Sequence, residues 1–461
     1  MSTVLIKIVQ VVLALSFLIL IHELGHFTFA KLFKTRVEKF YLFFNPKFSI
    51  VRCKKINGKL KFKFFSKNGG EWDETPSTEY GIGWLPLGGY CSIAGMIDET
   101  TGKDDLPAVP QPWEFRTKPA WQRFFIMFGG VLFNFILAIV LYACILGTWG
   151  EEYLKTDDAV YGVAVNDLSY EIGFRDGDRI LSIDGVPTDN FATLQVDMVR
   201  SKAREAVVLR GGDTVRVAID PVYIPAMLNT PGMFDLAFPF VVAEVPENSI
   251  NHDADLKPGD AVKAIDGEPM FIVQSVRKAL QQHKAESVTA TLERDGSLVD
   301  AALQVDTAGM VGVVLDADPE HYFNVTKKSY NALSAIPAGA AKAWKTIANY
   351  VKELGLIFSP KTEAYKSVGS FIAIGKIFPA TWDWYKFWSL AALFSIMLGV
   401  LNILPIPALD GGHILFLLVE MITGKKPGDK FLEVAETIGM IFLIGLMILA
   451  FGNDIRGLFI H

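Results

Sequence analysis

One short motif in the first apolar stretch carries the side chains best suited to catalysis. His22 and His26 stand four residues apart, and Glu23 directly follows His22. On an α-helix this spacing places the two imidazoles about 40° apart and about 6 Å along one face, so both can bind one zinc ion at about 2.0–2.1 Å. Glu23 is then close enough to take a proton from a water that the ion activates, without becoming a ligand. The pattern predicts a hydrolytic zinc site rather than two core histidines beside a glutamate that reaches the membrane surface.

A catalytic zinc ion also needs a third protein ligand and one open position. The residues from Asn402 to His413 offer Asp410 and His413 at the end of a later apolar run. Pro405 and Pro407 break the helix there and expose backbone that protein or a cavity must satisfy. A carboxylate at such a break is costly without a cationic partner, which favours Asp410, while His413 is a rival on spacing alone. The remaining histidines lie in the long segment between the second and third apolar runs or at the C-terminus: His252, His283, His321 and His461.

The elements that must position these residues are membrane spans. The chain has 461 residues and a net charge of −6, with 51% hydrophobic and 20% charged residues and a mean hydropathy of +0.31. These values exclude a disordered or purely soluble chain, the acidic balance argues against a nucleic-acid binder, and three cysteines are too few for a disulfide framework. The apolar runs cover residues 8–30, Phe124–Trp149, Phe387–Leu409 and Leu432–Phe451. The first run resembles a signal peptide, but only Lys7 precedes it and no small-residue cleavage site follows, so we expect it to be retained as one of four spans.

Basic residues near the span ends predict the orientation. The segment from Lys31 to Lys67 is rich in Lys and Arg and contains one acid, Glu38, so we expect it to be cytoplasmic. The acids Glu151 and Glu152 follow the second span, and lysines return between the third and fourth. Both termini and the long segment between spans two and three are then extracytoplasmic.

That long segment contains an internal repeat. Residues 177–187 recur as residues 259–269 at an offset of 82, and each copy reads as a short strand between Gly-Asp and an Asp-Gly turn, followed by a helical stretch and a hairpin. This order resembles a pair of PDZ domains, which bind extended peptides at a sheet edge; the alternative is two small α+β domains of another kind. Beyond the repeat, apolar residues from Ala340 to Leu354 recur at helical spacing. They predict an amphipathic helix that lies on the membrane surface or packs against the repeat pair.

Together, HELGH in the first span and N-x-x-P-x-P-x-L-D-G-G in a later one resemble the site-2 protease family of intramembrane zinc metalloproteases, most closely its bacterial members with two PDZ domains. The resemblance implies one Zn²⁺ per chain, held by His22, His26 and Asp410, with Glu23 as the catalytic base. It also implies that Asn402 positions substrate. A second family feature, G-x-x-x-N, maps to Gly130 and Asn134, which would position substrate too; interhelical hydrogen bonding is the alternative for Asn134.

The stretch from Gly81 to Tyr90 resembles the membrane-reentrant β element of the family. It would offer a strand edge to an unwound substrate helix, through the residues Gly83, Leu85, Leu87, Gly88 and Gly89. Upstream, residues 45–68 predict an added basic hairpin around Ile56-Asn57-Gly58, near anionic lipid.

The expected fold is an α-helical polytopic membrane protein with about four spans, a membrane-associated β element and two inserted extracytoplasmic PDZ-like α+β domains. Its expected segments are the first span with the histidine motif (1–30), a cytoplasmic and reentrant β region (31–120), the second span (121–150), two PDZ-like domains (158–225 and 236–316), an amphipathic segment (327–380), the third transmembrane segment (385–420) and the fourth span (431–453).

The expected function is hydrolysis of peptide bonds within transmembrane segments of single-span membrane proteins. The expected partners are these substrates, the lipid bilayer and a peptide or substrate ectodomain at the PDZ pair, with no nucleic acid. The location implied is the bacterial inner membrane, with the active site toward the cytoplasm. The alternatives are a membrane-tethered PDZ adaptor with a vestigial metal site, which the intact Glu23 argues against, and a transporter, whose charged residues would line a path through several spans.

Overall fold

The chain divides into two units, and the first of them contains the histidine motif. The computed structural model describes residues 3–68, 72, 76–96, 109–270 and 272–459. The first unit comprises residues 1–150, 329–355 and 368–461, and the second comprises residues 151–328 and 356–367. The predicted zinc ligands all belong to the first unit, which is here called the helical unit; the second is called the outer unit.

The helical unit is built on long apolar helices. Its α-helices are α1 (Thr3–Leu32), α2 (Ala120–Trp149), α8 (Ala332–Ile357, whose last two residues belong to the outer unit), α9 (Phe371–Ile377), α10 (Trp384–Ile403), α11 (Asp410–Thr423) and α12 (Asp429–Phe459). Among the described residues, α1, α2, α10 and α12 are long and apolar enough to cross a membrane. This confirms the prediction of four candidate spans.

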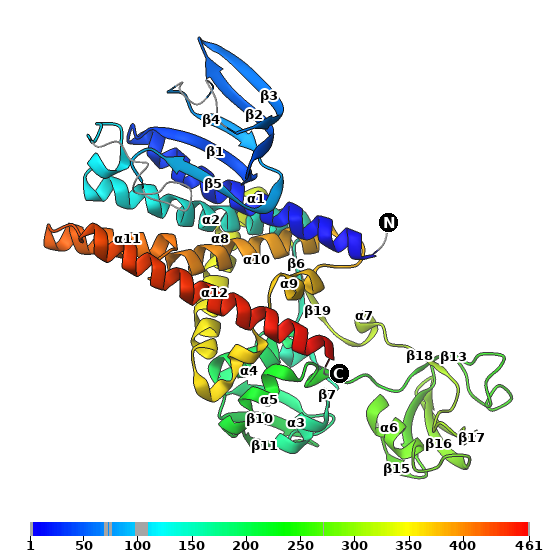
Figure 1. The fold of residues 1–461 in the computed structure, drawn as a ribbon. Helices are drawn as coiled ribbons and strands as arrows, with labels where there is room; N and C mark the ends of the chain where they lie inside the picture. Colours follow the sequence, from blue (N-terminus) through cyan, green and yellow to red (C-terminus); the bar gives the residue numbers. More distant parts are fainter. Residues whose placement is uncertain (1–2, 69–71, 73–75, 97–108, 271, 460–461) are drawn as a thin grey trace. The chain divides into compact units, whose positions relative to one another are not determined.

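Small residues let α1, α2 and α10 pack side by side (Figure 1). A Cβ atom on Gly25 of α1 would lie 2.2 Å from the carbonyl oxygen of Gly129 on α2, and one on Gly129 would lie 2.6 Å from the carbonyl oxygen of Gly25. The two backbones therefore touch at the depth of the histidine motif, as small residues allow in membrane helix pairs.

A five-stranded sheet follows α1. Its strands are β1 (Val37–Phe44), β2 (Phe48–Ile56), β3 (Lys59–Lys67), β4 (Glu79–Ile82) and β5 (Leu85–Ile93), in the order β3-β2-β4-β1-β5. β2 and β3 form the predicted hairpin, with Asn57 and Gly58 at positive φ in its turn. β5 pairs with β1 and is the edge strand next to α1. It thus has one side on which no described strand pairs.

The predicted helix break separates α10 from α11. α10 ends at Ile403, before Pro405 and Pro407, and Ala408 adopts φ +75°, a strained conformation for a residue with a Cβ atom. α11 then begins at Asp410. A Cβ atom on Gly411 would lie 2.0 Å from the Leu404 carbonyl oxygen, so only glycine lets the new helix start against the end of the old one.

The first repeat occupies the N-terminal part of the outer unit. Its elements are β7 (Val163–Val165), α3 (Asp167–Ile172), β8 (Arg179–Ile183), β9 (Val186–Pro187), α4 (Leu194–Ser201), β10 (Glu205–Arg210), β11 (Asp213–Ala218), α5 (Ile224–Asn229) and β12 (Phe234–Leu236). β12 pairs with β7, so this repeat continues beyond the expected boundary at residue 225.

The second repeat has the same order of strands, with α6 (Val273–Leu280) in the place of α4, and none of its described residues form a helix at the places of α3 and α5. Its elements are β13 (Val242–Glu244), β14 (Ala261–Ile265), β15 (Glu268–Pro269), α6, β16 (Ser287–Arg294), β17 (Ser297–Gln304) and β18 (Val314–Leu315). Each repeat contains a buried aspartate held by an arginine of its hairpin: Asp178 with Arg210 at 2.7 Å and Asp260 with Arg294 at 2.7 Å. The hydrogen bonds from Arg294 keep the pKa of Asp260 below its usual value.

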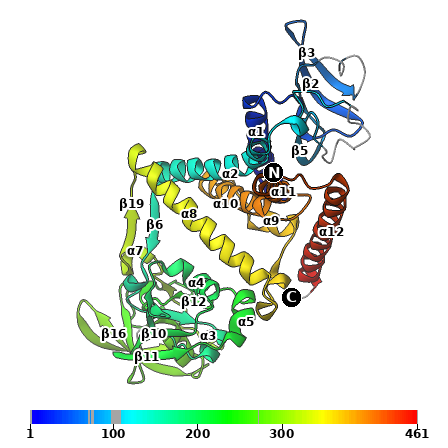
Figure 2. The ribbon, with the colours of Figure 1, turned by 90° about the vertical axis from the view of Figure 1, so that its left-hand side faces the viewer.

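A short ribbon is formed by the segments just before and just after the two repeats, and a long helix follows it. β6 (Glu151–Leu154) pairs with β19 (Val325–Lys328) in the antiparallel ribbon seen in Figure 2, and α7 (Pro319–Tyr322) precedes β19. α8 contains the predicted amphipathic helix but starts before Pro337, because Asn331 caps its first turn. Its buried face packs on α2, where a Cβ on Gly339 would lie 2.5 Å from the Ala143 nitrogen.

Candidate metal centre

Three side chains converge where α1, α2 and the start of α11 meet. The Nε2 atoms of His22 and His26 lie 3.2 Å apart, and Asp410 Oδ2 lies 3.1 Å from the first and 3.4 Å from the second. Both imidazoles are buried, at 8% and 7% exposure. Among the described residues these three form a group that can hold a metal ion, whereas His413 does not join it. The geometry thus favours Asp410 over its rival.

The spacing of these three atoms fits zinc. Ligand atoms at about 2.0–2.1 Å from a tetrahedral ion are about 3.3 Å apart, which is the size of the observed triangle. Asp410 Oδ2 is buried and, within the described part of the chain, makes no hydrogen bond of good geometry. Three converging acceptor atoms repel one another unless a cation lies between them, so the donor set fits Zn²⁺.

The rear nitrogens of the imidazoles contact α2. His26 Nδ1 lies 2.9 Å from the Ile126 carbonyl oxygen, to which it donates, leaving the Nε2 lone pair for a metal. His22 Nδ1 lies 3.1 Å from the amide nitrogen of Asn134, and the amide oxygen of Asn134 is buried without a hydrogen-bond partner among the described groups. A half-turn of this amide brings its oxygen to His22 Nδ1 and satisfies both atoms, with Nε2 again free for the metal.

Gly130 makes room for both rings. A Cβ atom there would lie 2.5 Å from His26 Nε2 and 2.6 Å from His22 Cε1, too close for any side chain. Ile126, Gly130 and Asn134 are spaced by four residues and therefore share one face of α2. This face supports the His22–His26 pair along its length.

The two predicted asparagines contact opposite nitrogens of the same ring. The amide nitrogen of Asn402, near the end of α10, lies 3.3 Å from His22 Nε2, on the side of the predicted metal. Asn134 is fully buried behind the ring. Asn402 thus lies on the metal side of His22, whereas Asn134 lies behind the ring, where it can support His22.

A cavity of about 330 Å³ opens beside the three ligands. Glu23 lines it, and its carboxylate accepts a hydrogen bond from the backbone of Cys91 on β5. Of the β residues predicted from the sequence, Gly89 lines the cavity. Gly83 lies in the turn before β5, where its N–H donates to the Leu42 carbonyl oxygen, and Leu85, Leu87 and Gly88 lie in the first half of β5; the side chain of Leu87 is outside the described part of the structure.

Sequence reasoning missed several residues of the cavity. Cys91 and Ile93 continue the β5 wall, and Glu436 and Met440 come from α12. Glu436 Oε1 lies 3.8 Å from His413 Nε2, so His413 points to a carboxylate of α12. The sequence shows that Glu436 and Met440 are four residues apart and so share one helix face. Nothing in the sequence indicates that this face meets the helix with the histidine motif.

Comparison with known proteins agrees with this geometry. The profile of Peptidase family M50 matches residues 10–71 and 64–446. The regulator of sigma-E protease RseP of Salmonella typhimurium is 27% identical over 485 residues, covering 98% of this chain and 99% of that protein. Two relatives whose names contain the words zinc metalloprotease come from Ralstonia nicotianae (27% identical, 99% of each chain) and Neisseria meningitidis (28% identical, 97% of this chain and 98% of the relative).

Proposed function

The chain belongs to peptidase family M50 and is a zinc metalloprotease, and on this premise we propose that it cuts peptide bonds inside the transmembrane segments of single-span membrane proteins. One observation carries the proposal: two of the three converging ligand atoms belong to α1, which is long and apolar enough to cross a membrane. The site lies next to a cavity with an edge strand as one wall. A substrate segment within the bilayer can reach such a site without leaving the membrane.

His22, His26 and Asp410 would hold one Zn²⁺ ion per chain. When bound, the ion lowers the pKa of a water from about 15.7 toward about 7 and polarises the scissile carbonyl. Glu23 accepts the proton of the attacking water and passes it to the leaving amine. The hydrogen bond from the Cys91 backbone holds the Glu23 carboxylate on the cavity side of α1.

A helical substrate hides its carbonyl groups in its own hydrogen bonds, so it must be unwound locally before attack. The side of β5 that faces no described strand supports this step, because a substrate strand can add there through main-chain hydrogen bonds. Gly89 is the predicted edge residue that lies at the cavity, and Asn402 stands where a carbonyl oxygen would gain negative charge. Gly83, Leu85, Leu87 and Gly88 would extend the contact along the strand.

Asn134 acts in this scheme as a positioning residue for His22. Its amide oxygen accepts the Nδ1–H of His22 and so fixes the tautomer that presents Nε2 to the metal. Neutral imidazole carries one proton, so an acceptor behind the ring and a metal in front of it require each other.

The proposed location is the inner membrane of a bacterium, with the lysine-rich segment after α1 and the active site toward the cytoplasm. The repeats are then extracytoplasmic PDZ-like domains that meet a peptide or the ectodomain of a substrate. A cavity of about 210 Å³ in the second repeat supports this role, since it lies between α6 and β18 and is lined by Arg277, Leu280 and Leu315.

The decisive experiment compares the wild-type chain with Glu23→Gln in proteoliposomes that contain a single-span model substrate. We expect the variant to bind one zinc ion per chain and to cut nothing, because Glu23 is a base and not a ligand. Glu38→Gln, an exposed carboxylate of β1, is the control and should cut normally. A wild-type chain that binds zinc yet cuts no membrane substrate would favour the adaptor alternative.

A further inference from the structure

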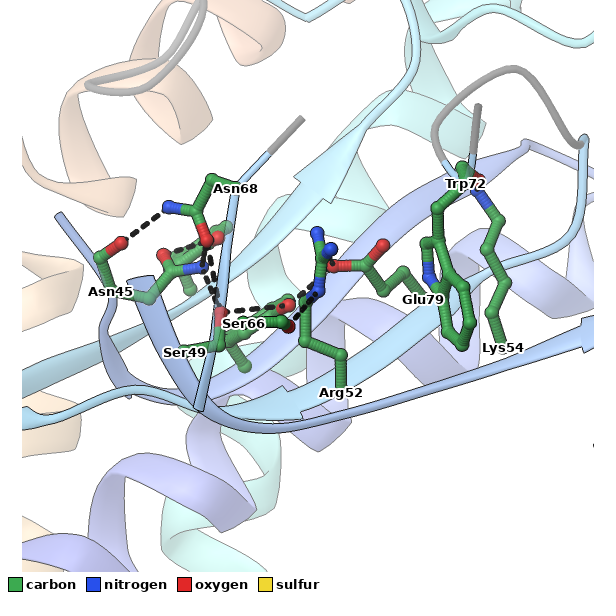
Figure 3. A network of polar contacts seen from close by, with 10 residues as sticks. Asn45, Ser49, Arg52, Lys54, Ser66, Asn68, Trp72 and Glu79 are labelled. Atoms are coloured by element: carbon green, nitrogen blue, oxygen red, sulfur yellow. Dashed lines mark hydrogen bonds and ion pairs between the residues drawn. The ribbon is translucent and has the colours of Figure 1, made fainter. Parts of the chain in front are cut away.

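The two faces of the five-stranded sheet differ in whether the protein covers them. One face is closed by the polar network in Figure 3: Glu79 contacts Tyr41 and Arg52, and the Lys54 ammonium donates to the Trp72 carbonyl oxygen at 2.8 Å. The Lys63 ammonium lies 4.6 Å from the centre of the Trp72 ring. This face thus has its partners within the chain.

The opposite face is apolar and open. Strand pairing places side chains from four strands on it, and we call it the apolar sheet face: Leu60, Phe62 and Phe64 of β3, Val51 and Cys53 of β2, Tyr80 and Ile82 of β4, and Phe40 and Leu42 of β1. Lys55 of β2 pairs with Leu60 and lies on the same face, next to the hairpin turn. Leu60, Phe62 and Phe64 are exposed at 64%, 57% and 65%, and Tyr80 and Ile82 at 42% and 40%. Adjacent large apolar side chains at such exposure mark a binding surface rather than scattered surface residues.

The apolar sheet face continues into a candidate membrane span. The Phe27 ring of α1 lies 5.2 Å from the Phe40 ring and 6.0 Å from the Tyr80 ring. Phe27 belongs to α1, whose apolar residues lipid would surround. The row that begins at Phe27 runs outward through Phe40 and Tyr80 to Phe62 at the far edge of the sheet, without a charged residue in it.

The hairpin that bears this face is cationic. Between Glu38 and Glu71 the sequence has no acid, and the edge strand alternates Lys59, Lys61 and Lys63 with the apolar residues. In a strand this alternation puts the lysines on one face and the apolar side chains on the other. Long lysine side chains at a sheet edge can reach phosphate groups beside an apolar face that dips into acyl chains.

We propose that the apolar sheet face lies in the lipid–water interface of the bilayer, with the lysines of the β2–β3 hairpin on anionic headgroups. Charge complementarity and continuity with α1 select this occupant over a soluble protein or a second copy of the chain. The inference rests on the membrane placement of α1 and not on the proteolytic activity. It gives the added hairpin a role: it anchors the outer edge of the sheet, so that β5 at the other edge keeps a fixed place beside the cavity.

The test is a spin-label scan of β3 in the full chain, reconstituted in phosphatidylcholine vesicles with or without phosphatidylglycerol. Single cysteines replace Leu60, Phe62 and Phe64, or Lys61 and Lys63 as matched controls, in a background where Cys53, Cys91 and Cys144 are alanine. Retained zinc binding, measured for each variant, shows that it is folded. Collision with oxygen reports lipid, and collision with a water-soluble nickel complex reports water.

We expect the ratio of oxygen to nickel collisions to be several-fold higher at positions 60, 62 and 64 than at 61 and 63, giving a period of two along β3. Phosphatidylglycerol should raise the ratio, and a Lys59→Gln, Lys61→Gln, Lys63→Gln variant should lose that increase in a scan of positions 62 and 64. Equal ratios at both sets of positions would overturn the proposal, and so would an unchanged ratio in both lipid mixtures. Spin–spin broadening at position 62 that disappears on dilution with unlabelled chain would identify a second copy as the occupant instead.

Discussion

Replacing Asn134 with alanine should weaken zinc binding although this residue is not a ligand. The change removes the side-chain amide that contacts His22 Nδ1 and that, turned as proposed above, accepts the Nδ1–H; His22, His26 and Asp410 stay intact. The site is fully buried, so the imidazole N–H then faces a small apolar cavity.

The magnitude follows from that lost partner. A buried donor without an acceptor costs about 1–3 kcal/mol. Since about 1.4 kcal/mol corresponds to a tenfold change in affinity, zinc binding should weaken about 5- to 150-fold, which brackets the roughly 10- to 100-fold found for outer-shell partners of metal ligands. A water that enters the space left by the amide would place the result at the lower end of this range.

Two further variants separate this role from simple packing. Asn134→Asp restores an acceptor of nearly the same shape, so it should recover most of the lost affinity. Ser395→Ala removes a buried hydrogen bond of 2.7 Å that the Ser395 hydroxyl donates to the backbone carbonyl oxygen of Asn134. This change is at the same residue of α2 but leaves the contact of the Asn134 side chain with His22 intact. It should lower the melting temperature without changing the zinc affinity.

The assay is competition for zinc between the detergent-solubilised chain and a chelator of known affinity, with cleavage of a membrane substrate measured in parallel. Unaltered zinc affinity in Asn134→Ala would refute the reasoning. Failure of Asn134→Asp to improve on alanine would also refute it, because an asparagine that donates to substrate or to another helix is not replaced by a carboxylate.

Three other outcomes are expected. Asp410→Asn should lose most zinc while His413→Ala keeps it, as atomic absorption of the purified chains would show; the reverse pattern would mean that the third ligand is misassigned. Gly130→Ala should abolish stoichiometric zinc, since its Cβ overlaps both imidazoles, and a zinc-replete variant would contradict the helix contact. Arg294 lowers the pKa of Asp260 in the folded chain, so this pair stabilises the second repeat at pH values above the aspartate pKa of the unfolded chain, about 3.9. That stability is lost as the pH falls through the lower pKa of the folded chain. Hydrogen exchange of β14 and β16 should therefore become faster in acid, and Asp260→Asn should weaken this pH dependence.

The convergence of His22, His26 and Asp410 was predictable because the geometry that brings them together is mostly local. The four-residue spacing of His22 and His26 fixes them on one face of one helix, and two prolines before Asp410 force a break where a carboxylate can point inward. The period of 82 residues similarly revealed both repeats. By contrast, Glu436 and Met440 join the cavity through a helix far along the chain, and nothing in their local pattern states which helix they face.

The β region shows how the register between strands limits prediction from the sequence. A run of apolar residues and glycines from Gly81 to Tyr90 indicates strands, but the register between β1 and β5 decides which of them reach the cavity. That register places Leu42 opposite Gly89 and Val37 opposite Ile93, so the wall of the cavity begins near the last predicted residues and continues to Ile93. Register depends on pairing with β1 and is not encoded within β5 alone.

The different positions of the two asparagines around His22 depend on the phase of α2 against α1. The close contact of Gly25 with Gly129 fixes that phase, and the next residue, Gly130, then faces both imidazoles. One helical turn further, the residue on the same face must meet His22 from behind, and that residue is Asn134. The spacing G-x-x-x-N is visible in the sequence, but it does not indicate which helix packs against the face of α2 that carries Gly130 and Asn134. Once the glycine contact sets the phase, a residue predicted to position substrate lies behind His22, where we propose that it serves as the acceptor that leaves the other ring nitrogen to the metal.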